Sequence, residues 1–391
     1  NKNLFRLFEQ VHGPAITAAV NSPQSGPALS FRNQQLNNSQ QEAIRAILEN
    51  DELLIVHGPP GTGKSTTLAE AIYQLVQRGE KVLVSAPSNA AVDHLSKSLI
   101  NLGVNLLRVG NSSKTDAAVF AHTPEGKLGN SKSQKEIKQL KIRAEEFRRM
   151  ALKYKRSFGK AEREQRNLLF KEVKSIRAEI RKLQDYNEQK LFEEAAVIAG
   201  TPIGLYDAGV DHMKFNSLFL DEAGQCIEPL AWCIFPMAEK LVLADDHWQL
   251  PPTVLSQQAA ALGFNNSILE VAIHHTNAVY LLNTQYRMRE SIAGFSSRYF
   301  YNELLKTAEH LQNSGTHITF IDTAGSGYNE KQGPDGISLQ NEGELQIVRQ
   351  YIEQEGWNAA GTAFISPYSG QVAAAREVLP STMRISTIDS F

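Results

Sequence analysis

The sequence contains little cysteine and no long apolar run. Its two cysteines, Cys226 and Cys233, have neither Cys-x-x-Cys spacing nor nearby histidine partners, so we expect no disulfide framework and no zinc site. This cysteine usage indicates a reducing compartment. No signal peptide opens the sequence and no apolar stretch approaches the ~18 residues of a membrane span. We therefore expect a soluble intracellular protein without a membrane partner.

Net charge is also nearly absent, but the small total conceals an asymmetry. The chain of 391 residues has a formal charge of -2, whereas residues 132–190 contain 19 basic and 9 acidic residues. The remainder then has 21 basic and 33 acidic residues. A basic segment on an acidic protein is either a polyanion contact or a solvated helical surface. The length allows two or three domains.

A glycine-rich segment follows the first predicted strand. Leu53 to Val56 are apolar and indicate a buried strand, and Thr66 to Gln77 have helical periodicity. A complete phosphate-loop motif lies between them, and it predicts a polyphosphate site in which backbone N–H groups and a helix N-terminus bind phosphates. Lys64 would reach the β and γ phosphates and Ser65 would ligate magnesium. The expected nucleotide-binding loop is Gly58, Pro59, Pro60, Gly61, Thr62, Gly63, Lys64, Ser65 and Thr66.

Polar residues follow several later strands. Asp221 and Glu222 end the apolar segment that starts at Ser217, and we expect Asp221 to hold magnesium and Glu222 to activate the attacking water. Gln249 follows the strand Leu241 to Ala244 and suits a sensor of the terminal phosphate. Arg287 supplies a planar positive charge for the γ phosphate.

Two further residues are candidates for adenine contacts. Tyr286 offers a face for stacking. Gln40 lies near a predicted helix start with Ser39 as N-cap, and its amide offers a donor and an acceptor to the adenine edge. A glutamine on a helix surface is the alternative interpretation of Gln40.

The order of segments predicts an α/β fold with a helical insertion. Further strands are expected at 81–85, 106–109, 196–200 and 279–282. Two apolar stripes, one from Ile137 to Ala151 and one from Leu169 to Leu183, predict an antiparallel helical hairpin with a turn at 157–159. Outward cations such as Lys153, Lys155 and Arg156 are expected to contact phosphates.

A second α/β unit is expected after residue 284. Strands are predicted at 317–321, 362–366 and 384–388, and helices at 342–354 and 370–379. The sequence stops at Phe391, just after a strand, and therefore looks truncated.

These motifs resemble the superfamily 1 helicases, in particular the 5′-to-3′ branch that includes the nonsense-mediated-decay and immunoglobulin mu-binding helicases. The similar segments are Gly58-Pro59-Pro60-Gly61, Ser85-Ala86-Pro87-Ser88-Asn89, Asp221-Glu222-Ala223-Gly224-Gln225, Gln249-Leu250-Pro251-Pro252 and Gln285-Tyr286-Arg287-Met288. The resemblance implies tandem RecA-like P-loop NTPase domains, each a parallel sheet flanked by helices, with an all-helical insertion. It also implies ATP and magnesium as cofactors and single-stranded DNA or RNA as the partner of a monomeric motor.

The resemblance also implies domain limits and strand-contacting residues. A lead-in covers 1–36, the first RecA-like domain 37–111 and 195–283, the basic insertion 112–194, and an incomplete second RecA-like domain 284–391. The expected nucleic-acid contacts are Pro87, Ser88, Asn89, Thr201, Pro202, Pro367 and Tyr368. One departure is Asp245, which stands where the family usually has glycine.

The resulting hypothesis is an ATP-dependent helicase or translocase that moves 5′ to 3′. An ATP-gated clamp or remodelling switch and a protein-directed ATPase are the alternatives.

Overall fold

The computed structural model describes residues 30–49, 52–129, 132–152, 160–312, 318–333 and 336–388. The chain folds into two compact units, one of residues 1–316 and one of residues 317–391. The expectations for residues 1–29, for the turn at 157–159 with Lys153, Lys155 and Arg156, and for the last three residues lie outside the described part.

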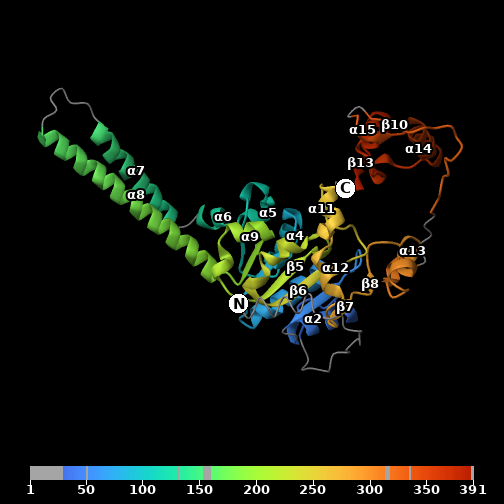
Figure 1. Ribbon diagram of the computed structural model, residues 1–391, viewed down its shortest axis with the longest axis horizontal. Coiled ribbons are helices and arrows are strands. Elements are labelled where there is room, and N and C mark those ends of the chain that lie inside the picture. The colour runs from blue at the N-terminus through green and yellow to red at the C-terminus, as the bar shows by residue number, and fades with distance from the viewer. Residues whose placement is uncertain are drawn as a thin grey trace. The chain divides into compact units, whose positions relative to one another are not determined.

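Seven parallel strands form the centre of the first unit (Figure 1). Their order is β3-β4-β2-β5-β6-β1-β7, so β1 lies between β6 and β7. The strands are β1 (Leu53–His57), β2 (Val82–Ser85), β3 (Leu106–Arg108), β4 (Val197–Gly200), β5 (Phe215–Asp221), β6 (Ala238–Asp245) and β7 (Val279–Leu281). All of them correspond to strands expected from the sequence, with ends that differ by a few residues.

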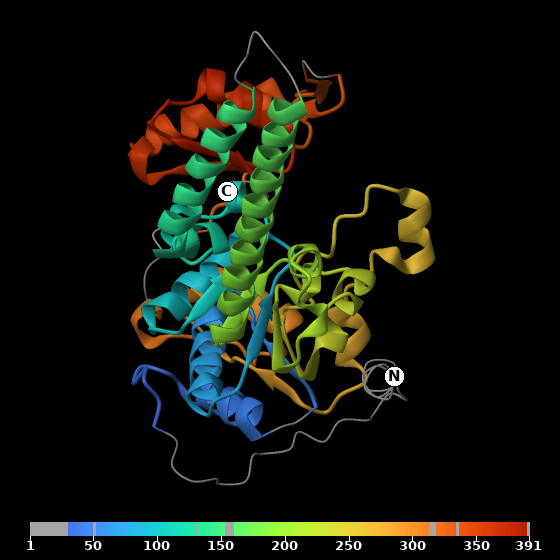
Figure 2. The same cartoon turned by 90° about the vertical axis from the view of Figure 1, so that its left-hand side faces the viewer.

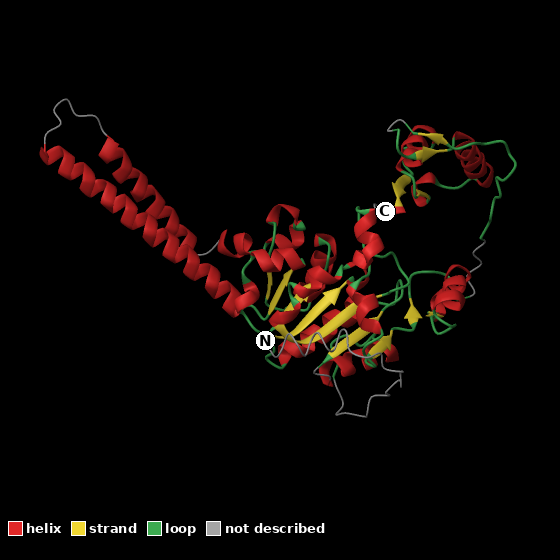
Figure 3. Cartoon of the chain, in the orientation of Figure 1, coloured by secondary structure: helices red, strands yellow, loops and turns green. Residues whose placement is uncertain are grey.

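Helices cover both faces of this sheet (Figure 3). Alternate residues of a buried strand point to opposite faces. Leu54 and Val56 therefore pack in one core with α2, α3 and α4, while Leu53 and Ile55 pack in a second core with α9, α10 and α12. The helices of the first unit are α2 (Asn38–Glu49), α3 (Lys64–Gln77), α4 (Asn89–Asn101), α5 (Ala117–Phe120), α6 (Pro124–Gly129), α7 (Lys132–Leu152), α8 (Lys160–Glu194), α9 (Pro202–Asp207), α10 (Glu228–Trp232), α11 (Gln257–Ala259), α12 (Ile268–Ile273) and α13 (Glu290–Phe300). This three-layer α/β arrangement agrees with the predicted RecA-like fold class.

The start of α2 differs from the expectation. The helix begins at Asn38, and the preceding Asn37 caps it, because the Asn37 Oδ1 atom accepts a hydrogen bond from the Gln40 backbone N–H at 2.9 Å. Ser39, the predicted N-cap, lies inside the helix and donates its hydroxyl to the same oxygen at 2.8 Å. Asparagine and serine are both good N-caps, and the Ser39 hydroxyl instead accepts a hydrogen bond from the Asn283 backbone N–H at 3.3 Å.

The basic insertion forms two long helices, α7 and α8, which lie side by side in both views (Figure 1, Figure 2). Their contact is apolar and contains Ile137, Ala144, Ile176 and Ile180, which confirms the two predicted stripes. Charged residues occupy the outer faces. Within the described part of the chain, no helix is both long and apolar enough to cross a membrane.

The second unit is smaller and also mixes helices with strands. A core of Leu345, Ala375, Leu379 and Met383 joins α14 to α15. Its elements are β10 (Lys331–Gln332), β11 (Leu339–Gln340), α14 (Glu342–Glu355), β12 (Ala363–Ser366), α15 (Ser369–Val378) and β13 (Arg384–Thr387), with β12 and β13 paired in parallel.

One predicted strand of this unit is wrong. Residues 318–321 form no strand and pair with no other described segment, and Phe320 is 88% exposed. Apolar sequence alone predicted a strand there, and a strand requires a hydrogen-bonding partner. The segment 284–312 belongs to the first unit by its contacts, and includes β8 (Thr284–Gln285) paired with β9 (Lys306–Thr307). The expected domain limits remain a prediction.

Candidate functional site

A cavity of about 720 Å³ opens at the carboxyl ends of the central strands of the first unit. Crevices at this edge are the usual ligand sites of open α/β sheets. The structure brings together in it most of the residues expected for the ATP site. The cavity is lined by Gly58, Pro59, Pro60, Gly61, Thr62, Gly63, Lys64, Ser65, Thr66, Ser88, Ala90, Ala91, His94, Asp221, Glu222, Gln249, Tyr286 and Arg287.

The glycine-rich loop packs closely against the segment that carries Arg287. Gly61 has a φ of +77°, and a Cβ atom there would lie 2.5 Å from the Arg287 Cβ atom. The Gly61 carbonyl accepts a hydrogen bond from the Tyr286 backbone N–H at 2.8 Å. Only glycine combines this backbone conformation with this close approach. The loop and Arg287 are therefore held in direct contact, although they are more than 220 residues apart in sequence.

Lys64 is the positive centre of the cavity. Its ammonium group donates a hydrogen bond of 2.5 Å to the Asp245 carboxylate. Burial lowers the pKa of Lys64, but the nearby charges of Asp245, Asp221 and Glu222 outweigh it and raise the pKa above its usual value. Lys64 is therefore fully charged at neutral pH.

Asp221 ends β5 beside this lysine, and Glu222 follows it. Burial raises the pKa of Asp221, and burial together with the charges of Asp221 and Asp245 raises the pKa of Glu222. A raised carboxyl pKa suits a proton acceptor. Glu222 also has a left-handed backbone, with φ of 54°, which is uncommon for a residue with a side chain. The Ser88 hydroxyl lies 3.3 Å from the Glu222 carboxylate and donates a hydrogen bond to it.

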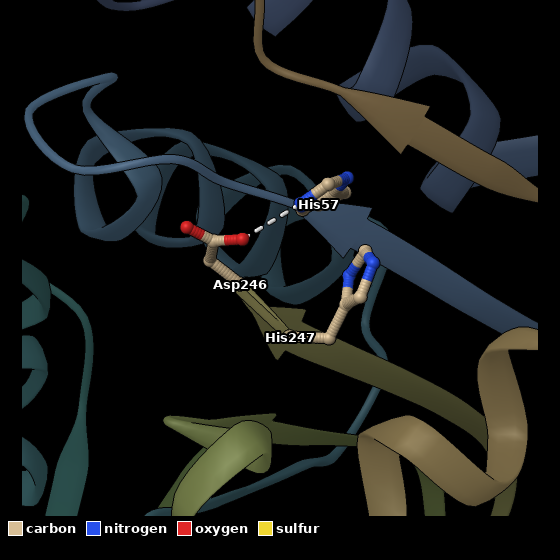
Figure 4. Close-up of side chains that lie close together, drawn as sticks. All are labelled: His57, Asp246 and His247. Carbon is tan, nitrogen blue, oxygen red and sulfur yellow. Dashed lines mark hydrogen bonds and ion pairs between the residues drawn. The ribbon is translucent and has the colours of Figure 1, made fainter. Parts of the chain in front are cut away.

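Asp246 organises the polar residues that follow β6. Figure 4 shows His57 and Asp246 facing each other at the ends of neighbouring strands, with His247 beside them. The two oxygens of Asp246 accept hydrogen bonds from His57 Nε2 at 2.9 Å, the Tyr301 hydroxyl at 2.5 Å and the Gln249 amide at 3.0 Å. Burial raises the pKa of Asp246, but these hydrogen bonds outweigh it and hold the pKa at about 2. Asp246 thereby orients Gln249 at the cavity.

The same group could also be considered for a metal ion, since ligand atoms of His57, Asp246 and His247 lie within 4.8 Å of one another. Both carboxylate oxygens are already used by hydrogen bonds, and His57 Nε2 is directed at one of them. In the described part of the chain only His247 Nδ1 of this group is buried without a partner. We interpret the group as a hydrogen-bond network.

The structure places Gln40 near the loop but outside the cavity lining. Its side-chain oxygen accepts from the Asn37 backbone N–H at 2.9 Å, and its amide nitrogen donates to the Thr62 carbonyl at 3.0 Å. Gln40 is 5% exposed, and both ends of its amide are in use. An adenine contact by Gln40 would therefore require these bonds to exchange. Tyr286 does line the cavity and is 42% exposed, and its hydroxyl accepts from the Asn37 amide at 2.9 Å.

The residues expected to contact nucleic acid lie in three places. Ser88 lines the first cavity, whereas Asn89 and Thr201 line a second one of about 400 Å³ that also includes Phe192 near the end of α8. Pro87 precedes Ser88, and Pro202 is buried at the start of α9. Pro367 and Tyr368 follow β12 in the second unit, and Tyr368 is 44% exposed.

Sequence reasoning missed several residues that shape these cavities. His94 lines the first cavity four residues after Ala90, so helical spacing within α4 could have indicated it. Arg108 is buried, and its guanidinium donates to Asp93 at 2.7 Å and to Asn89 at 2.8 Å, which holds Asn89 at the second cavity. No pattern in the sequence pointed to Arg108 or to the contact between Lys64 and Asp245.

The phosphate loop follows β1, and the carboxylates of Asp221 and Glu222 lie at the end of β5, with β6 between the two strands. This arrangement defines a P-loop NTPase fold. Two family models, both described as an AAA domain, match residues 35–257 and 264–391. The chain therefore belongs to the AAA-domain family, and within it to the superfamily 1 helicase group that the sequence resembles.

Three relatives illustrate this similarity. DNA-binding protein SMUBP-2 of Mesocricetus auratus is 32% identical over 93% of this chain and 39% of its own length. DNA polymerase alpha-associated DNA helicase A of Schizosaccharomyces pombe is 29% identical over 90% of this chain and 55% of its own length. ATP-dependent helicase upf1 of the same species is 32% identical over 77% of this chain and 31% of its own length. The chain thus spans 31% to 55% of the lengths of these relatives.

Proposed function

We propose that this chain is the ATP-hydrolysing core of a helicase or translocase that moves 5′ to 3′ along single-stranded DNA or RNA. The observation that carries the proposal is the cavity in which the phosphate loop, two carboxylates, Gln249 and Arg287 meet. The names of the relatives, which include a DNA-binding protein and helicases, support a nucleic-acid track. The 5′-to-3′ direction rests on the family resemblance.

The cavity residues divide the chemistry of ATP hydrolysis among them. Lys64 neutralises the β and γ phosphates, and Arg287, from the segment packed against Gly61, adds a second positive charge. Glu222 accepts the proton of the attacking water, for which its raised pKa is suited. Gln249, anchored by Asp246, reports the presence of the terminal phosphate.

Ser65 and Asp221 fit a magnesium ion by the chemistry of their donors. A hydroxyl and a carboxylate that line one cavity with a phosphate loop are hard oxygen ligands of the kind that magnesium prefers. When bound, the ion neutralises charge that develops on the phosphates. Asp221 is buried beside Lys64, so its carboxylate is already oriented.

The proposed nucleic-acid contacts adjoin the ATP cavity through Ser88. This residue caps α4 by accepting a hydrogen bond from the Ala91 backbone N–H at 3.1 Å, and it also contacts Glu222. A strand bound at Pro87, Ser88 and Asn89 could thus reach the catalytic carboxylate through one side chain. Backbone contacts of this kind tolerate every sequence, as a translocating protein requires.

The test is steady-state ATPase activity with and without single-stranded DNA or RNA. We expect stimulation by at least one polymer, and a loss of about 10²- to 10⁴-fold in the Glu222→Gln variant, because general-base catalysis contributes this much. Glu355→Gln, the same change at an exposed residue at the end of α14 that lines neither the ATP cavity nor the second cavity, is the matched control and should retain activity. If ATP binds but neither polymer stimulates hydrolysis, a protein-directed ATPase becomes the better interpretation.

The second candidate is an ATP-gated clamp or remodelling switch. The contact between Ser88 and Glu222 favours it as much as a motor, because a hydrogen bond from the strand-contacting segment to the catalytic carboxylate is sufficient for gating. Strand displacement distinguishes the two functions.

A further inference from the structure

Asp245 is the last residue of β6 and the partner of Lys64. It does not line the ATP cavity itself, but one of its oxygens accepts the 2.5 Å hydrogen bond from the Lys64 ammonium group. The lysine that the proposed function assigns to phosphates is therefore paired with a carboxylate of the protein. A nucleotide must compete with Asp245 for this charge.

The Asp245 carboxylate is fixed in its position. Its backbone carbonyl accepts from the Gly58 N–H at 3.0 Å, and its second carboxylate oxygen accepts from the Gly224 N–H at 3.0 Å. A Cβ atom on Gly224 would lie 2.9 Å from that oxygen, so the approach is close. Asp245 is 5% exposed. Lys64 has a long flexible side chain, so it is the lysine that changes partner when a phosphate arrives.

The charges around Lys64 are predominantly negative. Asp245, Asp221 and Glu222 all act on the ammonium group, and Asp245 has the largest favourable effect of the three. Once Lys64 turns to a phosphate, the charge of Asp245 loses its nearest cation while it remains buried. Free ATP has about two more negative charges than its magnesium complex, so this uncompensated carboxylate repels the free nucleotide more strongly.

We propose that Asp245 makes nucleotide binding depend on a divalent cation, and so acts as a specificity-determining residue that admits the magnesium complex and rejects free ATP. This inference rests on the proposed function, because it requires ATP in this cavity. It assigns to Asp245 a role in selection that is separate from hydrolysis.

The experiment compares equilibrium binding of ATP to the 391-residue chain in the presence of magnesium and in the presence of EDTA, by calorimetry. The quantity of interest is the ratio of the dissociation constants of metal-free and magnesium-bound ATP. We expect this ratio to fall by about tenfold or more in Asp245→Asn, through tighter binding of metal-free ATP. Asp245→Gly, which removes the side chain altogether, should change the ratio in the same direction.

Asp116→Asn is the matched control. Asp116 is also paired with a lysine, Lys97, at 2.8 Å, but it is exposed and outside the cavity, so the ratio should equal that of the wild type. An unchanged ratio in both Asp245 variants, or metal-free ATP that remains undetectable in them, overturns the inference while ATP binding itself survives. Absence of ATP binding in the wild type with magnesium instead overturns the proposed function.

Discussion

Tyr301 and Asp246 illustrate how a single hydrogen bond stabilises the site. The Tyr301 hydroxyl donates to the buried Asp246 carboxylate at 2.5 Å. Tyr301→Phe should lower the free energy of unfolding by about 2 kcal/mol at neutral pH, because a hydrogen bond to a buried charge is lost. Urea unfolding measures this loss.

The unfolding free energy lost in Tyr301→Phe should become smaller as the pH falls. Asp246 has a pKa of about 2 in the folded protein and 3.8 as its reference value. Its ionised form therefore contributes full stability above about pH 4, and the contribution is lost as the pH falls toward 2. The difference between wild type and Tyr301→Phe should shrink at about pH 3. Tyr299→Phe, at a tyrosine that is 73% exposed, should cost little, and an equal cost in both variants would contradict the network.

At the scale of elements, the hairpin of α7 and α8 has an apolar contact between its helices and charged residues on its outer faces. Its apolar residues face each other, whereas Lys174 and Arg177 are exposed on α8. Changing both to Glu should weaken binding to single-stranded DNA or RNA and flatten its salt dependence, since each lost phosphate contact reduces the slope of log K against log salt by about 0.7. Binding titrations at several salt concentrations measure both effects.

The control for the hairpin applies the same charge change elsewhere. Arg298 and Lys306 are exposed in the first unit outside the hairpin, and changing both to Glu alters the net charge by an equal amount. If this pair weakens binding as much as the hairpin pair, the effect is one of total charge. An unaltered affinity in the hairpin variant would leave α8 as a solvated surface.

At the scale of the whole molecule, a motor and a clamp differ in the work they do on a duplex. We expect ATP to drive displacement of a duplex that has a single-stranded 5′ overhang, and little displacement with a 3′ overhang. A gel assay of strand release measures this in the chain and in a longer protein that contains it. ATP-dependent binding without release from either substrate would favour the clamp.

Much of the first unit could be predicted because its signals are local. Leu53 to Val56 precede a phosphate loop whose spacing alone specifies the turn, and Asp221 and Glu222 end an apolar strand. The strand at 317–321 failed, because strand formation depends on a partner that apolar sequence does not identify. The N-cap at Ser39 failed because two neighbouring residues were chemically suitable.

By itself, the sequence determined the seven strands of the central sheet, the phosphate loop and the apolar stripes of the hairpin. These depend on periodicity and spacing within short segments. Only the tertiary structure decided that Lys64 pairs with Asp245, that Gln40 uses its amide within the protein, and that Asp246 joins β1 to the segment after α13. These contacts connect residues from 22 to 189 positions apart, and they follow from strand order and register, which no local pattern encodes.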